Sequence, residues 1–442
     1  MISNANAINQ TLTVTQMAKL TASDGAAGDR FGWGAISGDT AIVGASQDDD
    51  NGTDSGSAYI YSRQVDGSWV QSSKITASDG VAGDSFGYSV AISGDTVIVG
   101  APQNDDNGTS SGSAYLYARQ IDGSWVQISK VIASDGAAYD WFGQSVGISA
   151  GYAIVGAYGD DTNSGAAYLY LHQVGGSWTQ TNKFTANDRA AGDRFGIRVA
   201  ISGYHVIVGS YADDDKGTNS GSAYIYTRQT GGIWTQASKL LASDGSTGDN
   251  FGVSVAISGD HTIVGAYLDG YNGSARGAAY LYEHQIDGTW MQTSKITAND
   301  GEVGDNFGLS VSVSGDHAIV GAFKDDDKGS DSGSAYIYSR QEGGSWVQTD
   351  KLLASDGGIG DWFGGIVGIS GDYAIVAANS DDNNSGIDSG ASYVFSLNLN
   401  TPLDSSIEIT DASSVGEYTF TVTLPAPIEV GQGVFLNFDN LE

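Results

Sequence analysis

Short segments with strand-like apolar patterns follow one another along most of the chain. Residues 86–93 (FGYSVAIS) alternate apolar and polar positions, and residues 96–101 (TVIVGA) are an almost continuous run of β-branched and small residues. Two more segments, 113–118 and 125–132, follow after a polar loop and an Asp-Gly turn. No segment shows a sustained 3.6-residue apolar period, as a helix would. The pattern predicts an all-β fold built from four-stranded antiparallel units.

This four-strand unit occurs seven times in the chain. The dipeptide Phe-Gly returns every 53 to 56 residues, at Phe31, Phe86, Phe142, Phe195, Phe251, Phe307 and Phe363. Repetition at such a period is typical of arrays whose neighbouring units bury their apolar faces against each other. Seven four-stranded units around one axis predict a seven-bladed β-propeller.

The two ends of the repeated region predict how the ring closes. The seventh copy ends after its third strand and lacks the Trp-x-Gln-x-x-Lys segment that follows in the other copies. Residues 14–20 (VTQMAKL) carry the matching pattern, with Val14 in the position of the tryptophan. We therefore expect the N-terminal strand to complete the last blade, which removes two exposed sheet edges.

The repeat stops near residue 400, which divides the chain into two predicted parts. Residues 1–400 are expected to form the propeller, and residues 401–442 a short β segment. Within that segment, the stretches EYTFTVTL and GVFLNFDN alternate apolar and polar positions and predict two or three strands. Forty residues rarely form a stable β-domain alone. We interpret them as the start of an adjoining β-sandwich module or as a strand pair packed on the ring.

Charge and composition narrow the classes of partner. The formal net charge is −33, which argues against nucleic acid and anionic membranes, because both need a cationic surface. The chain has no cysteine, and no stretch approaches the roughly 20 apolar residues that span a bilayer. The start, MISNANAINQ, shows no classical signal peptide. We expect no nucleic-acid partner and no membrane insertion.

Two short motifs carry a resemblance to a known family. In the second copy, Phe86-Gly87 is followed by Gly100-Ala101-Pro102. This pair resembles the FG-GAP repeat, the blade unit of integrin α-subunit heads and of many bacterial surface proteins. The resemblance covers roughly residues 11–397 and implies a seven-bladed ring used for extracellular recognition. Such integrin blades carry a calcium loop between the first two strands, but here that connection is only Ser-Gly-Asp, so the family's calcium site cannot be carried over.

Most of the 52 acidic residues lie in two sets of loops. In an up-and-down blade, the loop between the second and third strands shares one face with the blade-to-blade loop. The resemblance marks this face as the ligand face. Loops of the form Asp-Asp-Asp/Asn-x-Gly offer the oxygen ligands that Ca²⁺ prefers. The candidate calcium ligands are Asp48, Asp49, Asp50, Asp105, Asp106, Asp213, Asp214, Asp215, Asp325, Asp326 and Asp327.

A structural role is the alternative for the recurrent acids. Aspartates cap turns and accept hydrogen bonds from loop amides, and recurrence in every blade favours such a role. Seven recurrent lysines end the adjacent strands, namely Lys19, Lys74, Lys130, Lys183, Lys239, Lys295 and Lys351. By the same reasoning His205, His261 and His317, which occupy one turn position in three consecutive blades, are interpreted as repeat copies and not as metal ligands.

Aromatic residues that interrupt the repeat are the candidates for ligand contact. Six tryptophans recur at one strand position, which indicates packing between blades, whereas Trp33, Trp141 and Trp362 break the pattern. Functional residues are expected where a repeat is broken. The predicted ligand-binding residues are Trp141, Trp362, Tyr139, Tyr158, Tyr211, Tyr267 and Tyr271.

These observations predict a non-enzymatic recognition or adhesion module of an extracellular or cell-surface bacterial protein. Its expected ligand is a protein or a glycan bound at the acidic loops, with Ca²⁺ as candidate cofactor. One alternative is a self-associating building block of a surface layer, filament or matrix. Another is a lyase or hydrolase, although no Ser/His/Asp constellation or phosphate loop stands out in the sequence.

Overall fold

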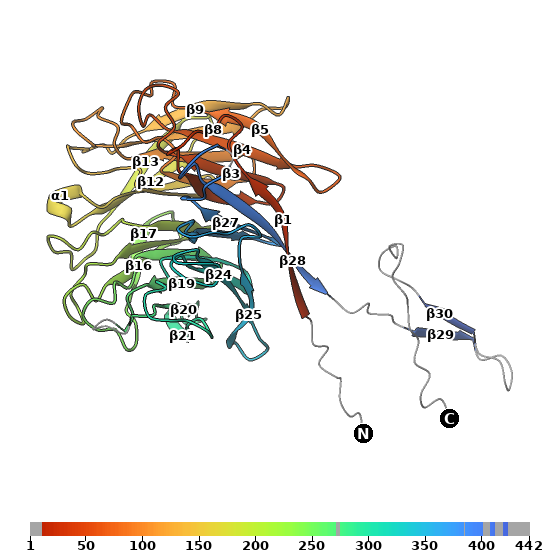
Figure 1. The fold of residues 1–442 in the computed structure, drawn as a ribbon. Coiled ribbons are helices and arrows are strands. Elements are labelled where there is room, and N and C mark those ends of the chain that lie inside the picture. The colour runs from red at the N-terminus through yellow and green to blue at the C-terminus, as the bar shows by residue number, and fades with distance from the viewer. Residues whose placement is uncertain (1–10, 271–274, 384, 401–406, 412–418, 423–442) are drawn as a thin grey trace. The chain divides into compact units, whose positions relative to one another are not determined.

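The repeated region folds into a ring of seven four-stranded antiparallel sheets, which confirms the predicted propeller (Figure 1). The computed structural model describes residues 11–270, 275–383, 385–400, 407–411 and 419–422. Val14–Leu397 form one compact unit. The first strand of each blade contacts the first strands of its neighbours around the axis of the ring, and the fourth strand lies outside.

Blades 1 to 3 follow one another directly along the chain. Their strands are β2 (Phe31–Ser37), β3 (Thr40–Ala45), β4 (Ser57–Arg63) and β5 (Trp69–Ile75); β6 (Ser89–Ser93), β7 (Thr96–Ala101), β8 (Ser113–Arg119) and β9 (Trp125–Val131); and β10 (Ser145–Ser149), β11 (Tyr152–Ala157), β12 (Ala166–His172) and β13 (Trp178–Phe184). Among the described residues the helical element is α1 (Asp160–Asn163), a single turn in the loop before β12. The described part of the chain therefore holds no candidate for a membrane-spanning helix.

Blades 4 to 6 repeat the same order. Their strands are β14 (Val199–Ser202), β15 (His205–Ser210), β16 (Ser222–Arg228) and β17 (Trp234–Leu240); β18 (Ser254–Ser258), β19 (His261–Ala266), β20 (Ala278–His284) and β21 (Trp290–Ile296); and β22 (Ser310–Ser314), β23 (His317–Ala322), β24 (Ser334–Arg340) and β25 (Trp346–Leu352).

Blade 7 is assembled from both ends of the repeated region. It contains β26 (Phe363–Ser370), β27 (Tyr373–Ala378) and β28 (Ala391–Asn400), and its fourth strand is β1 (Thr11–Leu20), which pairs with β28. The predicted closure by the N-terminal strand is therefore confirmed. The pairing satisfies backbone groups that would otherwise form two sheet edges.

Apolar side chains fill the seams between neighbouring blades. The core between blades 1 and 2 combines Ile42 and Ile60 of one sheet with Phe86 and Tyr117 of the next, each at most 3% exposed. Phe86, of the Phe-Gly motif, also meets the ring of Tyr115 edge-on at 5.5 Å between centroids. Burial of one such phenylalanine contributes about 2–3 kcal/mol, so the motif stabilises each seam.

Close approach of two backbones explains the glycines of both motifs. A Cβ atom on Gly100 would lie 2.0 Å from the carbonyl oxygen of Gly143, the Phe-Gly glycine of the next blade. Gly143 itself has a φ of +93°, which strains any residue with a side chain. The Gly-Ala and Phe-Gly motifs therefore meet across the seam, and a side chain at either glycine would push the blades apart.

The recurrent tryptophans also pack between blades, as the sequence indicated. Trp69 of blade 1 lies edge-on against Tyr373 of blade 7 at 6.0 Å, and Trp234 of blade 4 against Tyr152 of blade 3 at 5.7 Å. In both cases the partner is the first residue of a second strand.

The C-terminal segment contains β structure, as expected. β29 (Ile407–Asp411) and β30 (Thr419–Val422) form an antiparallel pair with Ile407 opposite Val422. The stretch GVFLNFDN lies outside the described residues.

Candidate functional site: the acidic-loop face and the axial pocket

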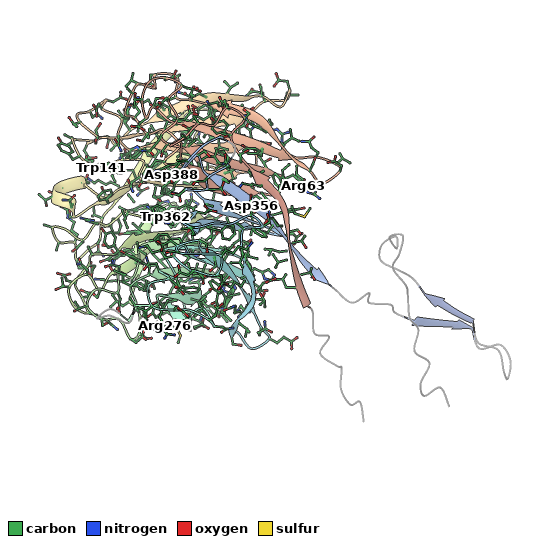
Figure 2. The ribbon with its side chains drawn as sticks, in the orientation of Figure 1. Arg63, Trp141, Arg276, Asp356, Trp362 and Asp388 are labelled. Atoms are coloured by element: carbon green, nitrogen blue, oxygen red, sulfur yellow. The ribbon has the colours of Figure 1, made fainter. Side chains whose placement is uncertain are left out.

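Alternate connections of the blades lie on opposite faces of the ring, as predicted. Asp188 of a blade-to-blade loop lies beside Asp213 and Asp215 of a second-to-third-strand loop, and we call their side the acidic-loop face. On the opposite face, His205 and His284 come from the two other kinds of turn, with ring centroids 5.0 Å apart. In Figure 2, Trp141 lies on the side of α1 and the acidic loops, and Arg63 toward the other side.

A lysine surrounded by carboxylates is the recurrent feature of the acidic-loop face. In blade 4, the Nζ atom of Lys239 lies 2.7 Å from Asp188, 3.0 Å from Asp213 and 2.5 Å from Asp215. The hydroxyl of Tyr224 lies 3.0 Å from Asp188 and 2.9 Å from Asp213. We call this arrangement a lysine cage. It holds one positive charge in a set of oxygen ligands.

Every blade contains a version of the lysine cage. The lysine–aspartate pairs are Lys74 with Asp24, Asp48 and Asp50; Lys130 with Asp79 and Asp106; Lys183 with Asp135 and Asp160; Lys239 with Asp188, Asp213 and Asp215; Lys295 with Asp244 and Asp269; Lys351 with Asp300, Asp325 and Asp327; and Lys19 with Asp356 and Asp381. In each cage one aspartate comes from the loop that enters the blade. The cage therefore ties that loop to the blade's own outer strand.

Charge pairing sets the protonation states of the cage. Burial alone would raise the pKa of Asp188, but hydrogen bonds from Lys239 and Tyr224 outweigh it and the net pKa is lowered. Burial would likewise lower the pKa of Lys239, but its aspartate partners raise it above the usual value. The second aspartate of the same loop behaves differently, because burial raises the pKa of Asp193, whose carboxylate accepts the N–H of Ala190 at 2.6 Å.

The predicted calcium ligands divide between two tasks. The first and third aspartates of the loops, such as Asp213 and Asp215, contact the cage lysine. The middle ones accept amides of their own loops, as Asp214 does from Asn219 N at 2.8 Å; Asp49, Asp105 and Asp326 do the same. The acidic groups are thus able to surround a cation, and a lysine ammonium stands among them.

A second feature lies on the axis of the ring. A cavity of about 320 Å³, which we call the axial pocket, is lined by residues from all seven blades. Its walls are mostly small and apolar positions of the first strands. The lining side chains that differ most between blades are Trp33, Gln144, Arg198, Phe323, Trp362 and Asn379.

Aromatic and amide groups form contacts at this pocket. The ring of Trp33 stacks on Tyr88 with centroids 4.7 Å apart, and Gln144 Nε2 donates to the Tyr88 hydroxyl at 3.1 Å. Phe323 meets Trp362 edge-on at 5.9 Å. The pocket thus offers flat apolar surfaces beside hydrogen-bonding groups, as ligand sites commonly do.

Three of the predicted ligand-binding aromatics lie beside strand ends and not in the lining of the axial pocket: Trp141 precedes β10, and Tyr158 and Tyr211 follow β11 and β15. Trp141 stacks on Tyr158 at 6.1 Å, and the Tyr211 hydroxyl accepts a hydrogen bond from Arg194. Burial raises the pKa of Tyr158, Arg194 opposes the rise, and Tyr88 and Tyr211 add to it. Tyr158, Arg194, Tyr211 and Tyr88 therefore lie close enough for their charges to interact.

The remaining predicted residues differ in their surroundings. Trp362 lines the axial pocket, and the Tyr267 hydroxyl accepts from Asn250 Nδ2 at 3.4 Å. Tyr139 is 59% exposed, and Tyr271 lies outside the described residues.

Of the six pocket side chains that differ most between blades, sequence reasoning selected Trp362 and did not select Trp33, Gln144, Arg198, Phe323 or Asn379. The signal was present for Arg198, which stands where other blades have a serine, at Ser89, Ser145, Ser254 and Ser310.

Two histidines of the opposite face pack in the seams between blades. His205 and His261 pack edge-on against Trp290 and Trp346 of the following blades, the role that tyrosines play in blades 3 and 7. His205, Asp260 and His284 also bring potential ligand atoms within 4.8 Å of one another, a set of the kind that binds Zn²⁺. Because the same strand position packs on tryptophan in four blades, packing accounts for the histidines.

Comparison with known proteins supports the sequence motifs. No curated protein matches the chain. The family model described as the FG-GAP repeat matches seven segments, at residues 14–61, 69–117, 125–170, 178–226, 234–282, 290–338 and 346–395. Each segment begins with a fourth strand and ends with the third strand of the next blade, so the sequence repeat spans the seam between two sheets. Because these segments cover more than half of its residues, the chain belongs to the FG-GAP repeat family and resembles the integrin α-subunit propeller.

Proposed function

We propose that this propeller is a non-enzymatic recognition module, which binds a protein or glycan ligand at the mouth of the axial pocket on the acidic-loop face. The observation that carries this proposal is the gathering of non-repeated side chains at one place. Trp33, Trp362 and Phe323 come from different blades and meet around the axis, whereas the rest of each blade repeats. Closure of the ring does not require these side chains to differ between blades, whereas contact with a bound ligand would.

The setting proposed for this activity is extracellular or at a cell surface, as is typical of FG-GAP repeat proteins. The net charge of −33 suits this setting by keeping the module soluble and repelling anionic surfaces. The recurrent carboxylates are engaged with lysines and loop amides, which supports binding over catalysis. Turnover of any polysaccharide in a substrate panel would contradict the non-enzymatic part of the proposal.

The decisive experiment compares two aromatic truncations. The purified chain is screened against an array of glycans and against surface proteins, and the best ligand is then titrated with Trp362→Ala and Tyr204→Ala. Tyr204 is an aromatic residue that is 63% exposed and belongs to a turn on the opposite face. We expect Trp362→Ala to weaken binding at least about tenfold and Tyr204→Ala to leave it unchanged. Equal affinities for both variants would place the ligand elsewhere.

Self-assembly is the second candidate function, and one observation favours it. The tips of four third-to-fourth-strand turns carry fully exposed apolar residues, namely Val65, Ile121, Val174 and Ile286. They lie on the face opposite the acidic loops. Sedimentation of the chain at micromolar concentration, beside a variant with serine at these four positions, tests this function. Association that the serines abolish, together with an array without ligands, favours the building-block role.

The role proposed for calcium is competition with the lysines. The carboxylates of Asp188, Asp213 and Asp215 fit Ca²⁺ by chemistry, since it prefers hard oxygen ligands. The same oxygens contact the Lys239 ammonium, so an ion entering this cage must displace it. We propose that the lysines supply most of the positive charge of these loops, and that calcium assists only where it displaces one.

A further inference from the structure

Arg198 breaks a structural rule of the first strands. The position opposite the glycine of the second strand is serine in four blades, at Ser89, Ser145, Ser254 and Ser310. Each of these serines bonds to the next blade, at its first strand or just before it. The hydroxyls of Ser89 and Ser254 donate to the carbonyls of Gly143 and Gly308 at 2.8 Å, and those of Ser145 and Ser310 accept from the amides of Val199 and Val367. Arginine at this position gives up a bond that serves the ring.

The guanidinium of Arg198 lies in the wall of the axial pocket without a carboxylate partner among the described residues. Its hydrogen bond is to a neighbouring carbonyl, from Nη1 to Ile197 O at 3.0 Å. All seven recurrent lysines, by contrast, contact at least two carboxylates each. Among the described residues that line the axial pocket, Arg198 is the one that carries a charge.

Burial costs such a charge part of its hydration. It lowers the pKa of Arg198, while the nearby Tyr88 and Tyr211 raise it. Arginine nevertheless keeps its proton in proteins, so the pocket holds a fixed positive charge. A planar guanidinium presents two parallel N–H groups that match a carboxylate, and a ligand carboxylate would restore the missing counter-charge.

The other pocket groups indicate what the carboxylate is attached to. Trp33 and Trp362 offer flat apolar surfaces, and Gln144 and Asn379 offer amides for hydroxyl groups. The cavity of about 320 Å³ has room for a group of the size of one sugar ring. The surrounding acidic loops repel a polyanion, which favours a single carboxylate on an otherwise neutral body.

We propose that the axial pocket binds the terminal acidic sugar of an otherwise neutral glycan, with Arg198 pairing with the sugar carboxylate and Trp33 or Trp362 packing on its ring. This inference rests on the proposed function and names its ligand class. It also explains why the departures from the repeat gather in the first strands and beside them, the part of each blade that borders the axis.

The test titrates the full chain with glucuronic acid and with glucose, which differ only in the carboxylate, by quenching of tryptophan fluorescence and by calorimetry. We expect glucuronic acid to bind at least about tenfold more tightly than glucose. Arg198→Ser places the residue of four other blades at this position, so the fold is expected to be retained and thermal unfolding to stay at or above that of the parent. This variant is expected to lose the preference for glucuronic acid, and Arg198→Lys to keep part of it.

The outcomes separate this inference from the proposed function. Equal binding of the two sugars, or an unchanged preference in Arg198→Ser, overturns the inference. If neutral glycans still bind and Trp362→Ala still weakens them, the recognition function stands without it. If a peptide with a free terminal carboxylate binds in an Arg198-dependent way and glucuronic acid does not, the sugar assignment is overturned. If no glycan or protein binds in a way that Trp362→Ala weakens, both proposals fail.

Discussion

Each blade places the same kind of lysine between the same kinds of aspartate on the acidic-loop face, whereas the side chains around the axial pocket differ from blade to blade. The cages use Lys239 and its equivalents to neutralise buried acids such as Asp213, whose side chain is 5% exposed. The pocket instead holds Arg198, which has no carboxylate partner among the described residues, and is lined by both Trp33 and Trp362.

The difference teaches how a repeat protein divides its tasks. A feature that all seven blades need in order to close the ring is repeated, because each seam presents the same physical problem. A ligand bound on the axis, as we propose, would meet seven blades at once and need a different contact from each. Repetition therefore marks stability here, and under the proposed function its loss marks recognition.

Low pH is expected to have the largest effect on stability, because it protonates the aspartates of all seven lysine cages together. Asp188 and its equivalents have a lowered pKa when folded, so they stabilise the fold above their unfolded pKa, ordinarily 3.8, and this contribution is lost as the pH falls through the folded pKa. Asp193 and its equivalents have a raised pKa, so their protonation favours the folded state and partly offsets the loss. We expect the melting temperature to hold or rise slightly from pH 6 to about pH 4 and to fall steeply below.

Thermal melts followed by circular dichroism across this pH range test the direction in which the melting temperature changes. A melting temperature that declines steadily between pH 7 and pH 5 would contradict it, because the cage aspartates remain charged there.

Removal of one cage lysine is expected to have the next largest effect on stability. Lys239→Met leaves Asp188, Asp213 and Asp215 facing one another, and we expect a loss of about 1–3 kcal/mol in the free energy of unfolding. The loss is smaller than for a fully buried pair, since the Lys239 side chain remains 16% exposed. The control is Lys324→Met, at a lysine that lies 5.5 Å from the centre of the Phe323 ring and has no carboxylate partner among the described residues, and it is expected to change stability little. Chemical denaturation measures both.

Calcium sharpens this second test. The parent chain, whose cages already hold an ammonium, is expected to melt at nearly the same temperature in EDTA and in millimolar calcium. Lys239→Met offers Ca²⁺ three carboxylates, so calcium is expected to restore part of its lost stability. A large calcium shift in the parent chain, abolished by replacing Asp48–Asp50 and Asp213–Asp215 with asparagine, would instead make calcium the main cation of these loops.

The smallest expected effects come from the same substitution, tyrosine to phenylalanine, made once in a lysine cage and once near the axis. Tyr224→Phe removes a hydroxyl that lies at hydrogen-bond distance from two cage carboxylates, and we expect it to cost about 1 kcal/mol. Tyr267→Phe removes only a 3.4 Å contact with Asn250 near the axis and is expected to have no measurable effect on stability. Equal costs at both positions would mean that the two regions do not divide the tasks of stability and recognition.

The predictions from sequence succeeded where the physics is local and repeated. Alternation of apolar residues, Asp-Gly turns and the displaced Trp-x-Gln-x-x-Lys strand were enough to place four strands per blade and to close the ring with β1. The tryptophan packing followed from recurrence at one strand position. For the predicted ligand residues, sequence could nominate breaks in the repeat such as Trp141 and Trp362, but it passed over Arg198, since a single serine-to-arginine change inside a strand resembles ordinary drift.

The sequence by itself determined the number of blades, their strand order and the two faces, because these depend on patterns that each segment carries alone. Only the tertiary structure decided which charges meet. It placed Lys239 among Asp188, Asp213 and Asp215, which lie up to 51 residues away along the chain. It placed Arg198 on the axis, where none of the residues it describes supplies a carboxylate partner. Contacts between distant residues depend on how blades and loops pack in space, and no local pattern encodes the distance between two side chains.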